Sequence, residues 1–246
     1  MKTPFCRVGS KRLLAKRIVP LIPKHKIYVE AFAGSGAIYF AKDPSPVEVL
    51  NDLDKNLMED YHLLKTIKGR NFRTDLNTIP KITAFYKQDP KTPEDTLTWD
   101  LIDKCNGFGS LPVKNDRIYK ASNPYGKLKN IDDYQARLKH TLLHNQSYET
   151  ILKKYDSKET FFYLDPPYEK SEGLYKDSDF DFEKLEERLR KLKGRFLLSL
   201  NDSPNIRRIF DGYAIKPIVV KTYGNKEGVG FKGGRKELLI ANYPIR

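Results

Sequence analysis

The residues best suited to chemistry are Asp165-Pro166-Pro167-Tyr168, which directly follow the apolar run at 160–164. The two prolines stiffen this turn and remove two N–H donors, which leaves an edge rich in hydrogen-bond acceptors. The Asp165 carboxylate and the Pro166 carbonyl could both accept from one amino group, and Tyr168 offers a ring for a planar base. Accepting both hydrogens of a purine amino group would localise the nitrogen lone pair. The motif therefore predicts reaction at an aromatic amine, and a rigid turn without chemistry is the alternative interpretation.

A second candidate site is the turn Phe32-Ala33-Gly34-Ser35-Gly36, which follows a β-type run at 27–29. Glycines let the backbone approach a ligand closely, and Asp52, after the next apolar run, suits the hydroxyls of a ribose. The spacing matches neither G-x-G-x-x-G nor a P-loop, so neither a dinucleotide site nor a P-loop is predicted. A tight turn with Asp52 as a helix cap is the alternative.

These motifs need strands and helices to position them, and the apolar pattern predicts both. We expect strands at 27–29, 47–50, 160–164, 196–200, 215–220 and 238–243. We expect helices at 11–22 (interrupted by Pro20), after the glycine turn, at 55–68 and at 182–193, with residues 201–204 capping a further helix. This order predicts an α/β sheet with helices on both faces and ligands at the carboxyl ends of the strands.

Residues 69–140 differ in character from the segments on either side. They contain five prolines, many Asn and Asp residues, and aromatic residues spaced among basic ones. This composition indicates an inserted subdomain or an extended loop region rather than a continuation of the α/β core.

Composition narrows the class of protein. The 246 residues are 39% hydrophobic and 12% aromatic, which fits one packed core with a small subdomain and excludes a disordered chain. No apolar stretch approaches the roughly 20 residues that cross a bilayer, and the start lacks the apolar region of a signal peptide. Cys6 and Cys105 are too few for a disulfide scaffold or a zinc site, so we predict a reducing, intracellular (cytoplasmic) location.

The charge is strongly basic and unevenly distributed. The net charge is +13, and residues 1–26 hold eight Lys or Arg residues and no acid. A basic surface favours a polyanion such as DNA or RNA, because binding releases counterions. A merely solubilising surface is the alternative.

Together these features resemble the Dam-type (D12 class, group α) DNA adenine-N6 methyltransferases. The resemblance rests on Phe-x-Gly-x-Gly, the acid after the second strand and Asp-Pro-Pro-Tyr, in the family's order. The segment 8–14, Val-Gly-Ser-Lys-Arg-Leu-Leu, is similar to the family's Gly-Gly-Lys motif, with Ser10 in place of the second glycine. The resemblance implies a Rossmann-like S-adenosylmethionine-dependent methyltransferase sheet. Residues 1–56 and 141–246 would form the catalytic domain, and 57–140 an inserted target-recognition (DNA-binding) subdomain.

The resemblance also implies an activity and a cofactor. The enzyme would transfer a methyl group from S-adenosylmethionine to N6 of a flipped-out adenine in double-stranded DNA, leaving S-adenosylhomocysteine. No metal would be required, and the protein would act as a monomer or as a dimer induced by DNA. Asp165 and Pro166 would hold the adenine N6, and Tyr168 would stack on the flipped base. Dam-type relatives often read GATC, but the recognition residues diverge here and no target sequence is predicted.

The cofactor residues follow by position. Lys11 and Arg7 would contact the methionine part of S-adenosylmethionine, although relatives often carry an aromatic residue at the Arg7 position. Asp52 would bind the ribose hydroxyls. Ser147, where many relatives have Asp, falls in the segment that contacts the cofactor adenine. The remaining members of the implied pocket are Phe32, Gly34, Gly36 and Asp165.

The middle segment is expected to read DNA. A hairpin there would present basic and aromatic side chains, and 104–109 resembles another family loop near the DNA. Such side chains could contact guanine in the major groove or only phosphate. An irregular surface insertion is the alternative. The implied nucleic-acid-binding residues are Arg117, Tyr119, Lys120, Asn123, Tyr125 and Lys127.

Two other functions stay open. An RNA base amino methyltransferase would use the same acceptor motif, but RNA enzymes often add a separate recognition domain, which is absent here. A catalytically inactive DNA-binding relative is the alternative from another class. The intact acceptor motif and the retained Gly34 and Gly36 argue against that loss of activity.

Overall fold

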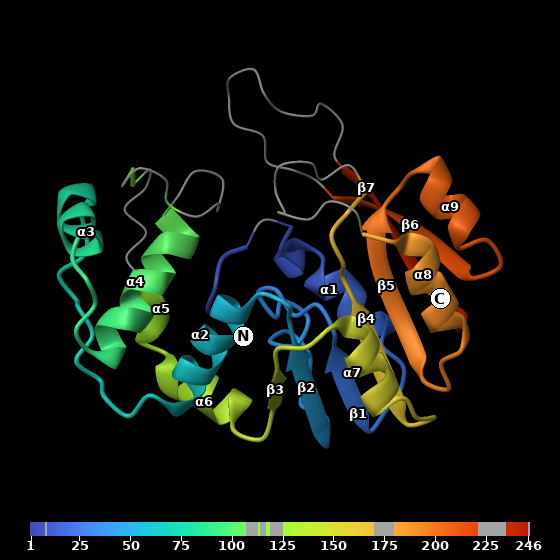
Figure 1. Ribbon diagram of the computed structural model, residues 1–246, viewed down its shortest axis with the longest axis horizontal. Coiled ribbons are helices and arrows are strands. Elements are labelled where there is room, and N and C mark those ends of the chain that lie inside the picture. The colour runs from blue at the N-terminus through green and yellow to red at the C-terminus, as the bar shows by residue number, and fades with distance from the viewer. Residues whose placement is uncertain are drawn as a thin grey trace. The chain divides into compact units, whose positions relative to one another are not determined.

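The computed structural model describes residues 1–7, 9–106, 113, 117–118, 125–169, 180–220 and 235–245 (Figure 1). The chain divides into two compact units. Unit 1 comprises Met1–Arg12, Gly34–Pro44 and Asp54–Asn145, and unit 2 comprises Leu13–Ala33, Ser45–Leu53 and Gln146–Arg246. Among the helices of the described ranges, none is both long and apolar enough to cross a membrane.

Unit 2 is built on a twisted β-sheet. Its strands are β1 (Ile27–Glu30), β2 (Val47–Asn51), β4 (Thr160–Leu164), β5 (Arg195–Asn201), β6 (Ala214–Val220) and β7 (Arg235–Ala241). They lie in the order β2-β1-β4-β5-β7-β6; the first four are parallel, and β7 runs antiparallel to both its neighbours. Because the parallel strands end at one edge, the segments after β1, β2, β4 and β5 emerge on the same side of unit 2.

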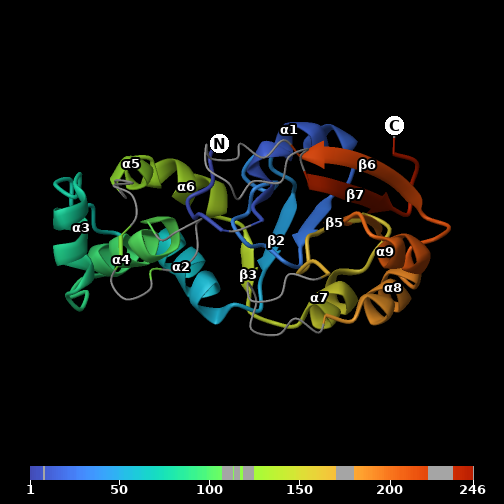
Figure 2. The same ribbon diagram turned by 90° about the horizontal axis from the view of Figure 1, so that it is seen from above.

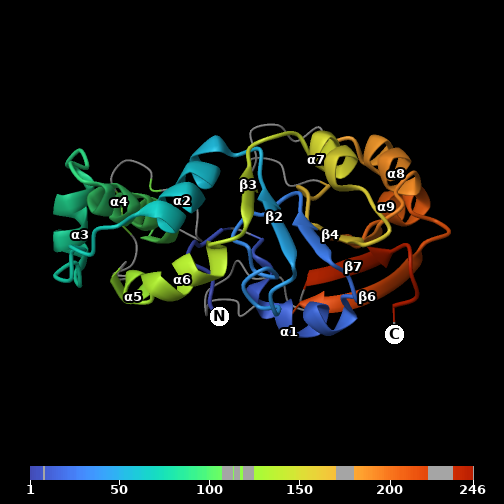
Figure 3. The ribbon, with the colours of Figure 1, turned by 90° about the horizontal axis from the view of Figure 1, so that it is seen from below.

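Helices cover both faces of this sheet, as predicted (Figures 2 and 3). α7 (Tyr148–Tyr155), α8 (Phe182–Arg190) and α9 (Pro204–Ile209) lie on one face, and α1 (Ala15–Ile18) with the 3-10 turn η2 (Val19–Leu21) lies on the other. Alternate strand residues such as Phe162, Leu164 and Leu198 point toward α7–α9 and form the main apolar core. Burying such side chains contributes roughly 1.5–3 kcal/mol each and fixes the strand register.

Unit 1 is mainly helical. Its elements are η1 (Lys11–Leu13, which extends into unit 2 at its last residue), α2 (Lys55–Thr66), α3 (Ile79–Tyr86), α4 (Pro93–Asn106), α5 (Tyr125–Leu128), α6 (Ile131–Leu138) and the short strand β3 (Leu142–His144). A small apolar core joins α3 and α4, with Tyr86 stacked on Trp99 at a ring-centroid distance of 4.5 Å. The described parts of 69–140 therefore contain packed helices joined by irregular segments, rather than one extended loop.

One predicted helix is replaced by turns. After Gly36 the backbone makes helix-like bonds, such as Phe40 N to Gly36 O at 2.9 Å, but no regular helix forms. Pro44 disfavours the helical conformation at the residue before it and ends the segment. Tyr39 and Phe40 are both buried, and they pack in different directions, toward Arg137 and toward Tyr61.

Candidate active site

The acceptor motif lies at the end of β4, the strand between β1 and β5. Every residue of β4 is buried, so the sheet fixes the point at which the motif begins. Pro166 is buried, while Asp165 and Tyr168 are half-buried. A carboxylate and a phenol ring therefore emerge together at the carboxyl edge of unit 2, the edge at which α/β sheets bind ligands.

Beside the motif, the sheet face opposite the main core carries buried polar side chains. Ser199 of β5 donates to Glu237 of β7 at 3.3 Å, and its hydroxyl lies 3.4 Å from the Tyr168 hydroxyl. Glu237 and Ser199 are both fully buried, and Glu30, at the end of β1, is 1% exposed. Tyr168 is thus linked through its hydroxyl to the neighbouring strand.

Tyr163 adds an unsatisfied group to this face. Among the described residues its buried hydroxyl has no hydrogen-bond partner. Burial, and after it the nearby charge of Asp165, raises the pKa of Tyr163 well above its ordinary value. The phenol therefore stays neutral at physiological pH and makes this part of the sheet polar without making it ionised.

Asn51, the last residue of β2, joins the loops around this edge. Its Nδ2 donates to Ala31 O and to Gln146 O, both at 2.9 Å, while its Oδ1 accepts from Gln146 N at 2.9 Å. Its own carbonyl accepts from Ala33 N at 2.8 Å. One buried amide residue thus fixes the end of β1 and the start of the segment that leads to α7. Asn51 is not among the predicted site residues, because the neighbouring carboxylate of Asp52 is the group expected to bind a ligand.

Half-buried aromatic rings lie next to these loops. Phe32 is 5.3 Å from Tyr148 and 5.7 Å from Phe180 between ring centroids. Burial, and after it the charge of Glu149, raises the pKa of Tyr148 to about 12. Ser147 is exposed and caps α7 by accepting from Thr150 N at 3.3 Å. The rings form an apolar surface of the kind that packs against a planar heterocycle.

Asp52 follows β2 and is half-buried. It does not cap the next helix, because Asp54 takes that position and accepts from Leu57 N at 3.2 Å. The interpretation of Asp52 as the α2 cap is therefore wrong. Leu53 beside it is 76% exposed, which leaves an apolar side chain next to the acid. That exposure could not be seen in the sequence.

In unit 1, the two glycines of the turn have different constraints. Both have positive φ, +48° at Gly34 and +64° at Gly36. A Cβ added at Gly34 would meet nothing within 4 Å, whereas one at Gly36 would lie 2.9 Å from Tyr61 Oη and 3.0 Å from the Phe40 ring. The hydroxyls of Ser10 and Ser35 lie 2.7 Å apart and hold the N-terminal motif against this turn. There is therefore open space beside Gly34, whereas at Gly36 the Tyr61 and Phe40 side chains leave no room for a Cβ.

The basic residues of the N-terminal motif also lie in unit 1. Lys11 is 4% exposed, and its Nζ donates to Gly9 O at 3.0 Å. Arg7 donates through Nη1 to Asp54 Oδ2 at 2.6 Å. Both side chains are thus positioned by protein groups.

The last residues of the predicted DNA-reading hairpin, Tyr125 and Lys127, do not form a hairpin strand. Tyr125–Leu128 is the short helix α5, in which Leu128 is buried and Lys127 Nζ donates to Pro4 O at 2.9 Å. The positions of Tyr119, Lys120 and Asn123 lie outside the described residues. Arg117 is described, and it lies in an irregular stretch. In the loop expected near DNA, Lys104 is instead buried in α4, with its Nζ 2.6 Å from Asp60 Oδ2.

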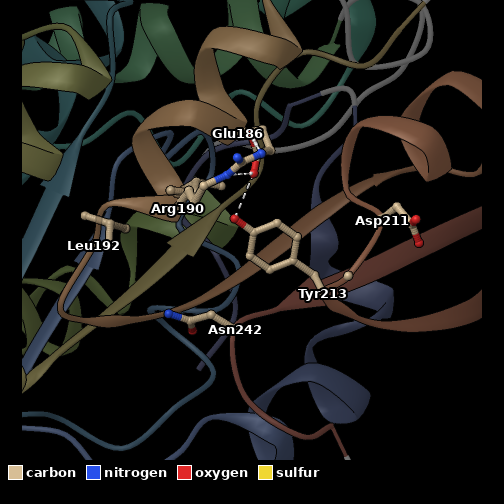
Figure 4. A pocket seen from close by; sticks show the side chains of 8 residues that line it. Glu186, Arg190, Leu192, Asp211, Tyr213 and Asn242 are labelled. Atoms are coloured by element: carbon tan, nitrogen blue, oxygen red, sulfur yellow. Dashed lines mark hydrogen bonds and ion pairs between the residues drawn. The ribbon is translucent and has the colours of Figure 1, made fainter.

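A cavity of about 300 Å³ lies in unit 2 away from the motif (Figure 4). It is lined by residues of α8, of the turn before β6 and by Asn242, which follows β7. The Asn242 side chain accepts a hydrogen bond from Phe196 N at the start of β5. Both Glu186 carboxylate oxygens are bonded, to Arg190 and to Tyr213. The cavity therefore lies at the opposite edge of unit 2 from Asp165, and its one glutamate already accepts hydrogen bonds through both oxygens. In the described ranges, no cluster of three or more His, Cys, Asp or Glu side chains could hold a metal ion.

The chain matches known proteins along most of its length. Residues 8–99 and 101–222 match the model of the D12 class N6 adenine-specific DNA methyltransferases. The chain is similar to Type II methyltransferase M.MjaIII of Methanocaldococcus jannaschii, with 27% identity over 288 aligned positions covering 98% of this chain and 99% of that protein. It is also similar to Type II methyltransferase M.CviBI of Paramecium bursaria Chlorella virus NC1A, with 26% identity covering 96% and 97%. Among solved structures, a precorrin-6y C5,15-methyltransferase of Geobacter metallireducens superposes with a TM-score of 0.42 at 10% identity, covering 96% and 93%.

Proposed function

The chain belongs to the D12 class N6 adenine-specific DNA methyltransferases, and we propose that it methylates N6 of an adenine flipped out of double-stranded DNA, with S-adenosylmethionine as donor. The observation that carries this proposal is the placement of Asp165-Pro166-Pro167-Tyr168 at the carboxyl end of β4. At this position the Asp165 carboxylate and the Pro166 carbonyl can accept hydrogen bonds, the two prolines contribute no backbone N–H, and the Tyr168 ring is half-buried.

The acceptor motif would act mainly by positioning and by charge. The Asp165 carboxylate and the Pro166 carbonyl accept the two N6 hydrogens, so that the nitrogen lone pair turns away from the purine ring. As N6 takes up the methyl group it would gain positive charge, which the Asp165 carboxylate would stabilise until N6 loses one of its two protons. Tyr168 stacks on the base, offsetting part of the few kcal/mol that leaving the duplex costs.

Each unit, taken by itself, offers residues that suit the proposed cofactor, which would supply a methyl group on its sulfonium. In unit 2, Asp52 provides a half-buried acid for ribose hydroxyls. Phe32 provides an apolar ring next to Tyr148, which follows Ser147 in the sequence. In unit 1, the open space at Gly34 would let backbone approach a ligand, a space that any Cβ would reduce. We assign the remaining cofactor contacts to Arg7, Lys11, Gly36 and Asp165.

Charge supports DNA as the partner. The net charge of +13 includes exposed basic side chains at Arg12, Lys16 and Lys24 in the N-terminal region. Neutralising phosphates with such residues releases counterions, so binding should weaken steeply with salt. We propose that 57–140 reads the target sequence, through Arg117, Tyr125 and Lys127 together with Tyr119, Lys120 and Asn123. The small core between α3 and α4 supports a separately packed recognition region.

The test is methyl transfer by the purified protein. Labelled S-adenosylmethionine is incubated with unmethylated plasmid DNA and, separately, with RNA, and digested nucleosides are identified by mass spectrometry. N6-methyladenine in DNA is expected, and mapping the modified sites gives the recognition sequence. Product on RNA alone would instead identify an RNA base methyltransferase. A protein that binds neither cofactor nor DNA would contradict the proposal.

A further inference from the structure

We propose that Glu169 is a positioning residue for the proposed reaction, holding Tyr168 in place for the target base. The inference rests on the proposed function and adds a residue outside the acceptor motif itself. Tyr168 is followed directly by Glu169, and this neighbour is bonded to three residues that run from the end of β5 to the first turn of α9.

The contacts of Glu169 use both its backbone and its side chain. Its N–H donates to Asn201 Oδ1 at 3.1 Å. One carboxylate oxygen accepts from Ser203 Oγ at 2.5 Å, and the other accepts from Asn205 Nδ2 at 2.9 Å. A half-buried carboxylate that accepts through both oxygens has a fixed orientation, because moving it breaks two charge-assisted bonds together.

The segment to which Glu169 is bonded, residues 201–205, is itself held by hydrogen bonds. Asn201 is the last residue of β5 and pairs with Glu237 of β7, and Asp202 N donates to Lys236 O at 3.2 Å. Ser203 caps α9 by accepting from Ile206 N at 3.1 Å while its hydroxyl donates to Glu169. The anchor of Glu169 is therefore part of the sheet and of a helix start rather than a free loop.

Tyr168 is consequently held from two directions. Its backbone is fixed by the next residue, and its hydroxyl lies 3.4 Å from Ser199 Oγ, within β5. The other end of the motif begins at β4, so the acceptor motif bridges two parallel strands. Stacking on an extruded base needs one ring position, and misplacing a reacting group by about 1 Å can cost on the order of 10²-fold in rate.

The test compares Glu169→Ala and Glu169→Gln with the wild-type enzyme on a duplex containing the mapped target. Glu187→Ala is the matched control, because Glu187 is an exposed glutamate of α8 whose carboxylate pairs with Lys191 at 2.7 Å. The measurements are kcat and KM for DNA, the Kd for S-adenosylmethionine, and the fluorescence of 2-aminopurine placed at the target adenine, which reports extrusion and stacking.

We expect Glu169→Ala to lower kcat by about tenfold or more and to change the 2-aminopurine signal, with the cofactor Kd kept within about twofold. Glu169→Gln keeps an acceptor for Ser203 and should recover most of the rate. If Glu169→Ala does not fold, Asn205→Ala should shift kcat and fluorescence in the same direction by a smaller factor. This substitution at an exposed residue removes one of the two side-chain contacts of Glu169, together with the bond between Asn205 and Arg208.

Two outcomes separate this inference from the proposed function. A wild-type enzyme that methylates DNA adenine, with kcat and fluorescence unchanged in Glu169→Ala, would overturn the positioning role alone. A wild-type enzyme without methyl transfer to DNA would overturn the proposed function and the inference together. Equal losses in Glu169→Ala and Glu187→Ala would also count against a specific role for Glu169.

Discussion

The Arg7 guanidinium donates to the Asp54 carboxylate over 2.6 Å, and Asp54 is the residue that caps helix α2. Burial alone would raise the pKa of Asp54, but the hydrogen bond and charge of Arg7 outweigh it and hold the pKa below its usual value. The N-terminal motif and the start of α2 are therefore joined within unit 1 by one ion pair.

Arg7→Gln should weaken this coupling in a pH-dependent way. A carboxyl whose folded-state pKa is lowered stabilises the fold above its unfolded pKa, and that contribution disappears as pH falls through the folded value. The thermal stability of wild type should thus exceed that of Arg7→Gln near neutral pH, by less than about 1 kcal/mol at this partly exposed pair, and the difference should shrink toward pH 3. Thermal unfolding between pH 3 and 7 measures it.

The control is Arg73→Gln. Arg73 pairs with Asp75 at a more exposed position, without a helix cap attached. A difference in stability that stays constant over the whole pH range in Arg7→Gln would contradict the assignment to Asp54.

Asp165→Ala should abolish methyl transfer while the protein stays folded. The variant loses the acceptor closest to N6 and the charge that stabilises the developing cation, so a loss of about 10²-fold or more in kcat is expected. Asp211→Ala is the control, because Asp211 is an exposed acid at the edge of unit 2 that carries the cavity of Figure 4. Full activity in Asp165→Ala would remove the basis of the proposed chemistry.

Asn51→Asp should destabilise unit 2 strongly. The substitution replaces an amide that donates to Ala31 O and Gln146 O with a carboxylate oxygen, so acceptors would face acceptors in a site that is 1% exposed. A loss of about 2–4 kcal/mol in unfolding free energy is expected from the unpaired buried groups. Urea denaturation measures it, with Asn56→Asp at an exposed position of α2 as the control. Equal losses in both variants would argue against the role of Asn51.

Gly34→Ala and Gly36→Ala should separate binding from folding. Both substitutions place a side chain at positive φ, which costs roughly 1–2 kcal/mol. Only Gly36→Ala also crowds Tyr61 and Phe40, so it should lower the melting temperature more. Gly34→Ala should mainly weaken S-adenosylmethionine binding, because its Cβ projects into open space. Titration calorimetry and thermal unfolding of both variants check this, and the reverse order of effects would contradict it.

Much of the sheet could be predicted from the sequence, since strands buried on both faces appear as short apolar runs. The runs at 47–50 and 160–164 became β2 and β4 nearly to the residue. The polar contacts that build the site were harder to find. Asn51 meets Gln146 and Glu169 meets Asn205 across long separations in sequence, and each residue type alone is common on surfaces.

Local sequence patterns predicted the wrong secondary structure at two places. A run of apolar residues after Gly36 suggested a helix, but burial of adjacent aromatic rings and the following proline left turns. The segment that includes Tyr125 and Lys127 was expected to belong to a hairpin, but these residues form a short helix in which Leu128 is buried. In both cases tertiary packing outweighed local preference.

The two faces of the unit 2 sheet can accept substitutions largely independently of each other. The face toward α7–α9 is mainly apolar and supplies cohesion, whereas Glu30, Ser199 and Glu237 lie on the other face near the acceptor motif. Because successive residues of a strand alternate between faces, a substitution at one position affects one face and largely spares the other. Lineages could therefore raise or lower their thermal tolerance through the helix-covered face while keeping the chemistry unchanged. A stabilised laboratory version could be sought there by the same route.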